Sequence, residues 1–212
     1  MELGALLISI LSVGIGLATP LILAALGELM SQKSGVLNVG LEGYMLMGSM
    51  GAYLGAFLTG NPWLGVLFSI IAGLLTSLIM AYLTITLASD QIVCGIGINV
   101  LAWGFTSYLV RLSGIHGSAK GFKSINIPVL SNIPFVGPVL FQQSVLTYLA
   151  AVLVIVFAII LYRTSFGLRV KAAGEDPLVC DSLGINVTHL RYLCVLLCGA
   201  MAGFGGSFYT LV

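Results

Sequence analysis

The chain has 212 residues, of which 59% are hydrophobic and only 7% are charged. Soluble domains carry about a quarter charged residues, so this composition excludes a soluble protein and predicts an integral membrane protein. The formal net charge of +1 gives no electrostatic reason to expect a nucleic acid as a partner.

Apolar runs long enough to cross a bilayer as helices, about 20 residues each, recur along the chain. The first lacks a cationic segment before it and is too long for the apolar core of a signal peptide, so we expect an uncleaved span. The six predicted spans are Gly4–Gly27, Val36–Thr59, Trp63–Ala88, Ile92–Leu112, Val145–Tyr162 and Leu190–Val212. They predict an all-α, polytopic helical bundle that forms a single domain over residues 1–212.

The second predicted span contains polar groups where hydrocarbon is expected. Between Ser34 and Gly55, Asn38 and Glu42 occur among repeated glycines, which loosen a helix. A charge at mid-bilayer costs at least about 2.5 kcal/mol, and Glu42 lies only a few residues from the cytoplasmic start of this span. Its carboxylate can therefore snorkel, face a cavity or be protonated. It can belong to a transport or gating pathway, or it can accept backbone amides that the glycines free where they interrupt the helix. We therefore expect an interrupted second span.

Asn99 is the other polar residue that lies deep in a predicted span. Its amide can form a hydrogen bond between helices, which contributes roughly 0.6 kcal/mol on average in a membrane. Alternatively, it lines the translocation pathway. The residues leave both roles open.

The four cysteines form neither a disulfide framework nor a pattern of metal ligands. Cys194 and Cys198 share a helix face, but no His or further Cys at ligand spacing accompanies them. We therefore expect small packing residues, no metal site and no cofactor.

Cationic residues near the span ends predict the orientation, because they favour the cytoplasmic side. Five of them fall on one side of the predicted topology: Lys33, Arg163, Arg169, Lys171 and Arg191. Three fall on the other side: Arg111, Lys120 and Lys123. This bias places the N-terminus outside the cell membrane and the connection Thr164–His189 in the cytoplasm.

The connection Thr164–His189 is the most charged part of the chain, and we predict a long loop with one short helix. Asp176 can cap the free amides of a helix that begins one residue later, and Gly184 favours its end. A helix of about two turns is marginal alone in water, and Pro177–Leu183 carries apolar side chains. We expect it to dock into a partner's groove, or to lie on its own protein or on the lipid interface. Thr188 is expected to cap the last span.

The segment FGLRVKAAGEDPLVCDSLGI, residues 166–185, resembles the coupling loop of ABC importer permeases. In that family the short helix of this loop inserts into a cleft of a separate ATPase subunit. The resemblance implies ATPase coupling by Phe166, Gly167, Leu168, Arg169, Ala172, Gly174, Glu175, Asp176, Pro177, Asp181, Gly184 and Ile185. No G-x-x-x-x-G-K-[ST] phosphate loop occurs in the chain. We therefore expect a transport subunit rather than an enzyme.

The second predicted span resembles its counterpart in permeases for branched-chain amino acids and simple sugars. Its order of Asn, Gly, Glu and Gly is most similar to the nucleoside and simple-sugar branch. The segment from Ile127 to Phe141 resembles the external loop of that branch, where a substrate-binding lipoprotein docks. The resemblance implies uptake of nucleosides, with simple sugars or branched-chain amino acids as alternatives. The expected residues of the translocation pathway are Asn38, Gly40, Glu42, Gly43 and Asn99.

The resemblance also implies partners and a longer chain. The expected partners are ABC ATPase subunits, a second permease subunit, an external binding lipoprotein, the small-molecule substrate and the lipid bilayer. Members of the family continue for several more spans, and this chain ends within an apolar, Gly-rich run, so we expect that its C-terminal part is missing.

Two other classes of membrane protein stay open on the residues alone. An ion-coupled secondary transporter also uses broken helices and buried carboxylates, although intramembrane charges are sparse here and essentially limited to Glu42. An integral membrane enzyme would need clustered catalytic groups, and no such constellation of His, Asp and Ser occurs in the sequence.

Overall fold

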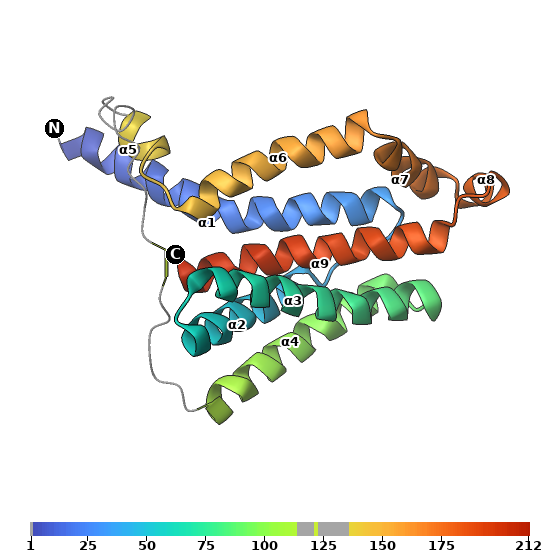
Figure 1. The fold of residues 1–212 in the computed structure, drawn as a ribbon, viewed down its shortest axis with the longest axis horizontal. Helices are drawn as coiled ribbons and strands as arrows, with labels where there is room; N and C mark the ends of the chain where they lie inside the picture. Colours follow the sequence, from blue (N-terminus) through green and yellow to red (C-terminus); the bar gives the residue numbers. More distant parts are fainter. Residues whose placement is uncertain (1, 114–120, 123–135) are drawn as a thin grey trace.

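The computed structural model describes residues 2–113, 121–122 and 136–212, which form a bundle of helices without strands in this described part. The long helices are α1 (Glu2–Lys33), α2 (Leu41–Thr59), α3 (Pro62–Ala81), α4 (Gln91–Ser113), α6 (Val145–Arg163) and α9 (Val187–Leu211). The shorter elements are the π-helix η1 (Tyr82–Thr86), α5 (Val136–Leu140), α7 (Ser165–Glu175) and α8 (Pro177–Ser182). In Figure 1, α7 and α8 lie at one end of the bundle, here called the α8 end, and α5 and the C-terminus lie at the opposite end.

The structure confirms the prediction of an all-α, polytopic membrane protein. Within the described residues, five helical segments are long and apolar enough to cross a membrane: Leu6–Lys33, Pro62–Thr86, Gln91–Leu112, Val145–Arg163 and Val187–Leu211. They match five of the six predicted spans. The remaining predicted span contains α2, which packs against α3, α4 and α9.

Local sequence signals set several helix ends. Gly60 ends α2 in the left-handed region, at a φ of +67°, which glycine adopts without strain. The Asn61 side chain then accepts a hydrogen bond from the backbone N–H of Trp63 at 3.0 Å, and Pro62 occupies the first turn of α3. These three residues reverse the chain direction between α2 and α3.

Small residues allow α9 to lie at the centre of the bundle, in contact with α1, α2 and α3. A Cβ on Gly203 would lie 2.6 Å from the carbonyl oxygen of Ser69 in α3. A Cβ on Gly48 of α2 would lie 2.5 Å from the carbonyl oxygen of Gly203. Three helices therefore meet at Gly203 through their backbones, which is typical of helix contacts in membranes.

The second predicted span, Val36–Thr59, has two parts of different structure. Residues 34–40, here called the α1–α2 link, form no helix, and α2 begins only at Leu41. From there α2 is continuous to Thr59. The expected interruption thus lies at the start of the span rather than at the glycines within α2, which serve close packing. In Figure 1 the chain leaves α1 at the α8 end and runs back to α2, which begins part-way along the bundle.

The predicted loop Thr164–His189 contains more helix than expected. The structure confirms the short helix as α8, but α7 is a second helix of 11 residues. Thr164 caps α7, because its side chain accepts a hydrogen bond from the backbone N–H of Gly167 at 3.2 Å. Val170 and Ala173 of α7 pack into a buried cluster with residues of α8 and α9. The expectation of a loop here was therefore wrong.

Helix α9 begins three residues earlier than predicted. The side chain of Asn186 accepts a hydrogen bond from the backbone N–H of His189 at 2.9 Å and caps the helix. The expectation that Thr188 is the cap was therefore wrong. Lys120, Lys123 and residues 127–135 of the predicted external segment lie outside the described residues.

Candidate functional site

The α1–α2 link has its backbone groups bonded by side chains of the surrounding helices. Its residues alternate between buried and exposed positions, as in a strand. Unsatisfied backbone groups are costly inside a membrane, and neighbouring side chains can supply the missing partners. Three such bonds are those of Ser31 Oγ to the Val36 carbonyl (2.8 Å), Arg191 Nε to the Ser34 carbonyl (3.1 Å) and the Leu37 N–H to Gln91 Oε1 (2.8 Å).

Glu28 and Asn38 join the middle of the link to α1 and α9. The backbone N–H of Asn38 donates to Glu28 Oε1 at 3.1 Å, and its Nδ2 donates to Cys198 Sγ at 3.5 Å. The thiol of Cys198 in turn donates to Glu28 Oε2 at 3.7 Å. Asn38 Oδ1 also accepts from the N–H of Gly40 at 2.9 Å. These contacts form a closed set of polar groups across α1, the link and α9.

Asn99 of α4 fixes the start of α2. Its Oδ1 accepts from the backbone N–H of Gly43 at 2.7 Å, and its Nδ2 donates to the carbonyl of Val39 at 3.1 Å. The two backbones approach closely here, since a Cβ on Gly95 would lie 2.9 Å from the backbone nitrogen of Gly40. Asn99 thus makes a hydrogen bond between helices, which was one of its two expected roles.

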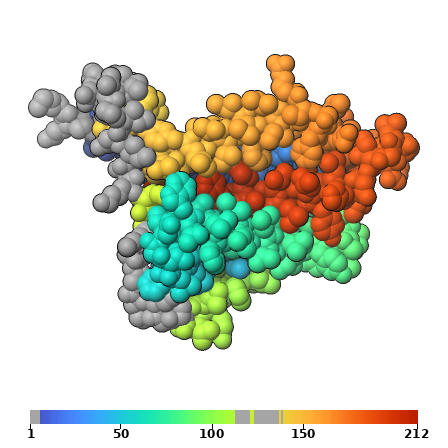
Figure 2. Space-filling model, in the orientation of Figure 1, coloured from blue at the N-terminus to red at the C-terminus, as the bar shows by residue number. Residues whose placement is uncertain are grey.

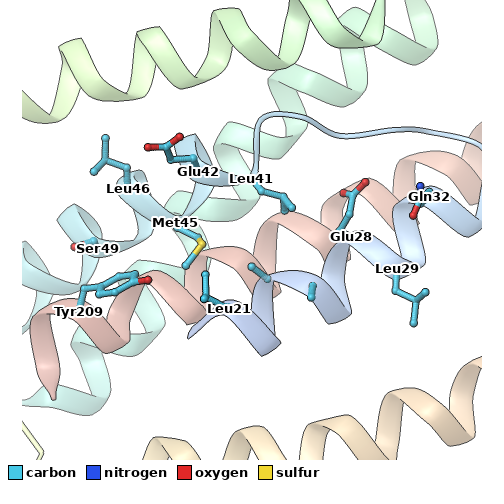
Figure 3. A pocket seen from close by; sticks show the side chains of 12 residues that line it. Leu21, Glu28, Leu29, Gln32, Leu41, Glu42, Met45, Leu46, Ser49 and Tyr209 are labelled. Atoms are coloured by element: carbon cyan, nitrogen blue, oxygen red, sulfur yellow. The ribbon is translucent and has the colours of Figure 1, made fainter. Parts of the chain in front are cut away.

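A cavity of about 800 Å³ opens between α1, α2 and α9. Its wall is mainly apolar, with Leu41 and Met45 as examples, and α9 contributes Tyr209. Two carboxyl groups belong to this wall, and Figure 3 shows Leu41 between Glu28 of α1 and Glu42 of α2. Small-molecule sites have volumes of about 300–1,000 Å³, so the cavity is large enough for a small organic solute.

The predicted pathway residues divide into two groups. Glu42 is exposed and lines the cavity. The second group, Asn38, Gly40 and Gly43, lies around the junction between the link and α2, close to Asn99. Sequence reasoning missed Glu28, because the first span was predicted to end at Gly27. The available signal was a carboxylate directly after an apolar run.

Helix α8 has the start and end that the sequence predicts. Asp176 Oδ1 accepts hydrogen bonds from the backbone N–H groups of Leu178 and Val179, each at 3.1 Å. Pro177 is the first helical residue, and Gly184 follows the helix with a φ of +77°. The helix is therefore well defined by its own caps.

Large apolar side chains of α8 and of its C-cap residue Leu183 are exposed, beside the exposed polar residues Asp181 and Ser182. Leu178 is 82% exposed and Leu183 is 73% exposed, whereas Cys180 is buried against the rest of the protein. Figure 2 shows α8 at one extremity of the molecule. A groove of about 520 Å³ lies beside it, with Asp181 and Ile185 on its wall.

Helix α7 packs between the end of α6 and the α1–α2 link. A Cβ on Gly174 would collide with the carbonyl oxygen of Lys33 and would lie 3.3 Å from the backbone nitrogen of Gly35. A Cβ on Gly167 would lie 2.5 Å from the carbonyl oxygen of Ile160 in α6. Glycine is required at both positions because backbone of another segment occupies the space of a side chain.

The predicted coupling residues divide into those with exposed side chains and those that shape or pack α7 and α8. The side chains that are open to a partner are Leu168, Arg169, Glu175 and Asp181. Those that cap, end or pack the α7–α8 unit are Phe166, Gly167, Ala172, Gly174, Asp176, Pro177, Gly184 and Ile185.

The described residues contain no group of three or more His, Cys, Asp or Glu side chains that could hold a metal ion. All four cysteines are free thiols. Cys194 and Cys198 are buried in the packing of α9 against its neighbours.

Comparison with known proteins gives a family match over most of the chain. The family described as branched-chain amino acid transport system / permease component matches residues 10–212. The guanosine ABC transporter permease protein NupQ of Bacillus subtilis is 40% identical over 206 residues, which cover 91% of this chain and 64% of NupQ. The nucleoside ABC transporter permease protein NupC of Lactococcus lactis is 38% identical over 203 residues, which cover 91% of this chain and 64% of NupC.

A third relative has a name for a different substrate. This relative is TsgC13 of Haloferax volcanii, which is provisionally named as a glucose ABC transporter permease protein. It is 38% identical over 198 residues, which cover 92% of this chain and 60% of TsgC13. The chain thus spans 60% to 64% of the length of these curated relatives. No solved structure matches the chain.

Proposed function

Because the chain belongs to the family of permease components of branched-chain amino acid transport systems, we propose that it is the membrane-spanning subunit of an ATP-driven importer of nucleosides. It contributes half of a translocation pathway, and a second permease subunit contributes the other half. An external lipoprotein delivers the substrate. Separate ATPase subunits hydrolyse ATP, and this drives the pathway from a state open to the outside to a state open to the cytoplasm.

The exposed apolar side chains of α8 and of its C-cap residue Leu183 carry this proposal. A helix of 6 residues is too short to be stable by its own backbone hydrogen bonds, yet its caps and its buried Cys180 hold it with Leu178 and Leu183 outward. Fully burying a large apolar side chain contributes about 1.5–3 kcal/mol relative to leaving it in water, and the part that exceeds the costs of association and ordering stabilises a complex. An ATPase subunit that covers α8 therefore gains affinity from side chains already in place.

The contacts of α7 supply a route from this docking site to the cavity. Gly174 lies against the backbone of Lys33 and Gly35, at the start of the α1–α2 link. The same link is bonded to Glu28, which lines the cavity. Movement of α8 by the ATPase subunits thus reaches the cavity wall through elements that touch one another.

The charges near the helix ends support an orientation with the α8 end in the cytoplasm. Five cationic residues belong to this end: Lys33, Arg163, Arg169, Lys171 and Arg191. Among the described residues, Arg111 at the end of α4 is the counterpart on the opposite side. By the positive-inside rule, α1 begins outside the cell.

Nucleosides are the proposed substrates because two of the compared relatives, NupQ and NupC, are named for guanosine and for nucleosides. The relative named for glucose is similarly close in sequence, so simple sugars are the alternative. The mainly apolar wall of the cavity favours the nucleosides, since a base presents more apolar surface for each hydrogen-bonding group than a simple sugar does.

Co-purification tests the docking of an ATPase subunit. The double variant Leu178→Asp and Leu183→Asp places charges on the face that is proposed to be buried. We expect the ATPase subunits to be lost from the purified complex and ATP-driven nucleoside uptake to cease, while the permease still inserts in the membrane. Leu140→Asp, at the opposite end of the bundle, is the matched control. Retention of the ATPase and of uptake by the double variant would reject the proposed function of α8.

A further inference from the structure

Glu28 is held on the wall of the cavity by the protein itself. Its Oε1 accepts the N–H of Asn38 at 3.1 Å, and its Oε2 accepts the thiol of Cys198 at 3.7 Å. Figure 3 shows the carboxyl group rising from α1 beside Leu41. A group that is fixed before the ligand enters loses little conformational entropy on binding. Glu28 is therefore already oriented for recognition.

The carboxyl group has acceptor capacity left for a ligand. The two oxygens of an ionised carboxylate offer about four acceptor positions. The contacts with Asn38 and Cys198 occupy one position on each oxygen. Because Glu28 also lines the cavity, each oxygen can accept one further hydrogen bond there. Two adjacent N–H or O–H donors of one ligand satisfy both oxygens at once.

The rest of the wall restricts the class of ligand. A simple sugar carries a hydroxyl group on nearly every carbon, and a wall made mostly of apolar side chains such as Leu41 and Met45 would leave many of these hydroxyls unpaired, which lowers its affinity. The wall residues, all within the described part, include no Lys, Arg or His. A ligand carboxylate or phosphate would thus meet Glu28 and Glu42 without a cationic partner. These two facts disfavour sugars, free amino acids and nucleotides.

A nucleoside satisfies each of these conditions. It is uncharged, its base has two apolar faces, and its donors lie at the edges. Tyr209 belongs to the wall, and an aromatic ring can stack on a base. Guanosine carries adjacent donors in two places, the N1–H and 2-amino group of the base and the 2′,3′-diol of the ribose.

We propose that Glu28 is the specificity-determining residue of this permease, which recognises a nucleoside by accepting two hydrogen bonds from adjacent donors while the base lies against the apolar wall. This inference rests on the proposed function and names the residue that selects its substrate. Glu42 contributes a second carboxyl group to the same cavity.

Equilibrium binding to the full permease in lipid nanodiscs, without its binding lipoprotein, tests the assignment. Radiolabelled guanosine is the ligand, and inosine and 2′-deoxyguanosine are the competitors. Inosine lacks the 2-amino group, and 2′-deoxyguanosine lacks one hydroxyl of the diol. We expect the wild type to bind guanosine on the order of tenfold more tightly than one of them. The analogue that is disfavoured shows which pair of donors Glu28 accepts.

Glu28→Gln is the decisive variant. Its amide oxygen can still accept the N–H of Asn38, but the amide NH₂ replaces one acceptor by a donor. We expect the preference for guanosine over the disfavoured analogue to fall to about one, with the thermal unfolding temperature unchanged. Asp90→Asn is the matched control, because it removes a carboxylate from the cap of α4, where Asn serves equally well.

Two results would overturn the assignment. One is a Glu28→Gln variant that keeps the preference of the wild type, and the other is a wild type that binds the three nucleosides equally or not at all. The second comparison needs no variant, so it decides even where Glu28→Gln fails to fold. ATP-driven nucleoside uptake by the wild-type complex is measured alongside. If uptake is present, the proposed function stands although the role of Glu28 fails.

Discussion

Gly174 of α7 lies against the carbonyl group of Lys33, the last residue of α1, with no side chain between the two backbones. Gly35 belongs to the same contact, since a Cβ on Gly35 would lie 3.5 Å from the Cα of Gly174. Only Asp176 separates α7 from α8. Under the proposed coupling we expect a displacement of α8 to reach the α1–α2 link through these backbone atoms, which yield less than flexible side chains do.

Gly174→Ala tests this contact as a part of the coupling route. The new methyl group collides with the Lys33 carbonyl, so α7 must move away from the link at a cost of about 1–3 kcal/mol. We expect ATP-driven uptake to fall sharply while the ATPase subunits stay bound, because the face of α8 is unchanged. Uptake in proteoliposomes and co-purification measure the two effects. The control is Gly97→Ala, whose Cβ would meet nothing within 4 Å; normal uptake by Gly174→Ala would contradict the route.

Asp176→Ala removes the cap of α8. The backbone N–H groups of Leu178 and Val179 lose their acceptor, at a typical cost of about 1 kcal/mol. We expect faster amide hydrogen exchange in residues 177–183 and weaker ATPase binding. Asp181→Ala removes a carboxylate from the same helix but leaves the cap in place, so its exchange rates should match the wild type. Equal exchange in both variants would show that the cap does not hold α8.

The ends of α8 could be predicted because their signals are local. Asp176 and Gly184 act on amides and dihedral angles within a few residues of themselves, so the sequence alone specifies them. The spans were predictable for a related reason, since each is a continuous apolar run. In both cases the physical cause lies within the segment.

The features that the sequence did not reveal depend on distant contacts. The charges and glycines of α7 predict a loop, yet Gly174 and Gly167 are needed because other backbones lie against them. Glu28 directly follows an apolar run, and this pattern predicts only the end of a span. Its role depends on Asn38 and Cys198, which lie 10 and 170 residues away in the sequence. A single sequence does not show such pairings.

Gly203→Ala tests the packing at the centre of the bundle. Its Cβ would lie 2.6 Å from the Ser69 carbonyl and 3.0 Å from the Cα of Gly73, so α3 and α9 must separate. We expect a loss of about 1–3 kcal/mol in stability, seen as a lower unfolding temperature in detergent. Gly104→Ala, with open space around its Cβ, should instead gain about 0.5–1 kcal/mol from helix propensity. A Gly203→Ala protein as stable as the wild type would mean that the helices separate without cost.

Asn99→Leu tests the brace at the start of α2. Leucine has a similar size but leaves the N–H of Gly43 and the carbonyl of Val39 without their partner. A backbone group left without a partner inside a membrane is costly, so we expect a lower unfolding temperature and faster proteolysis of the link. Thr106→Val on the same helix removes a hydroxyl whose two hydrogen bonds among the described residues are to carbonyls of α4 itself, and it should leave both unchanged. An unchanged Asn99→Leu protein would favour the pathway role for Asn99 over the brace.

Glu42→Gln separates the two roles that the sequence left open for this carboxylate. The side chain is exposed at the cavity, and no hydrogen bond joins it to another described residue. Exposed substitutions of this kind change stability by less than about 0.5 kcal/mol, so we expect an unfolding temperature equal to that of the wild type. Uptake should nevertheless decrease, because the variant removes one of the two carboxyl groups on the cavity wall. The opposite pattern, with lower stability and normal uptake, would identify Glu42 as a structural brace.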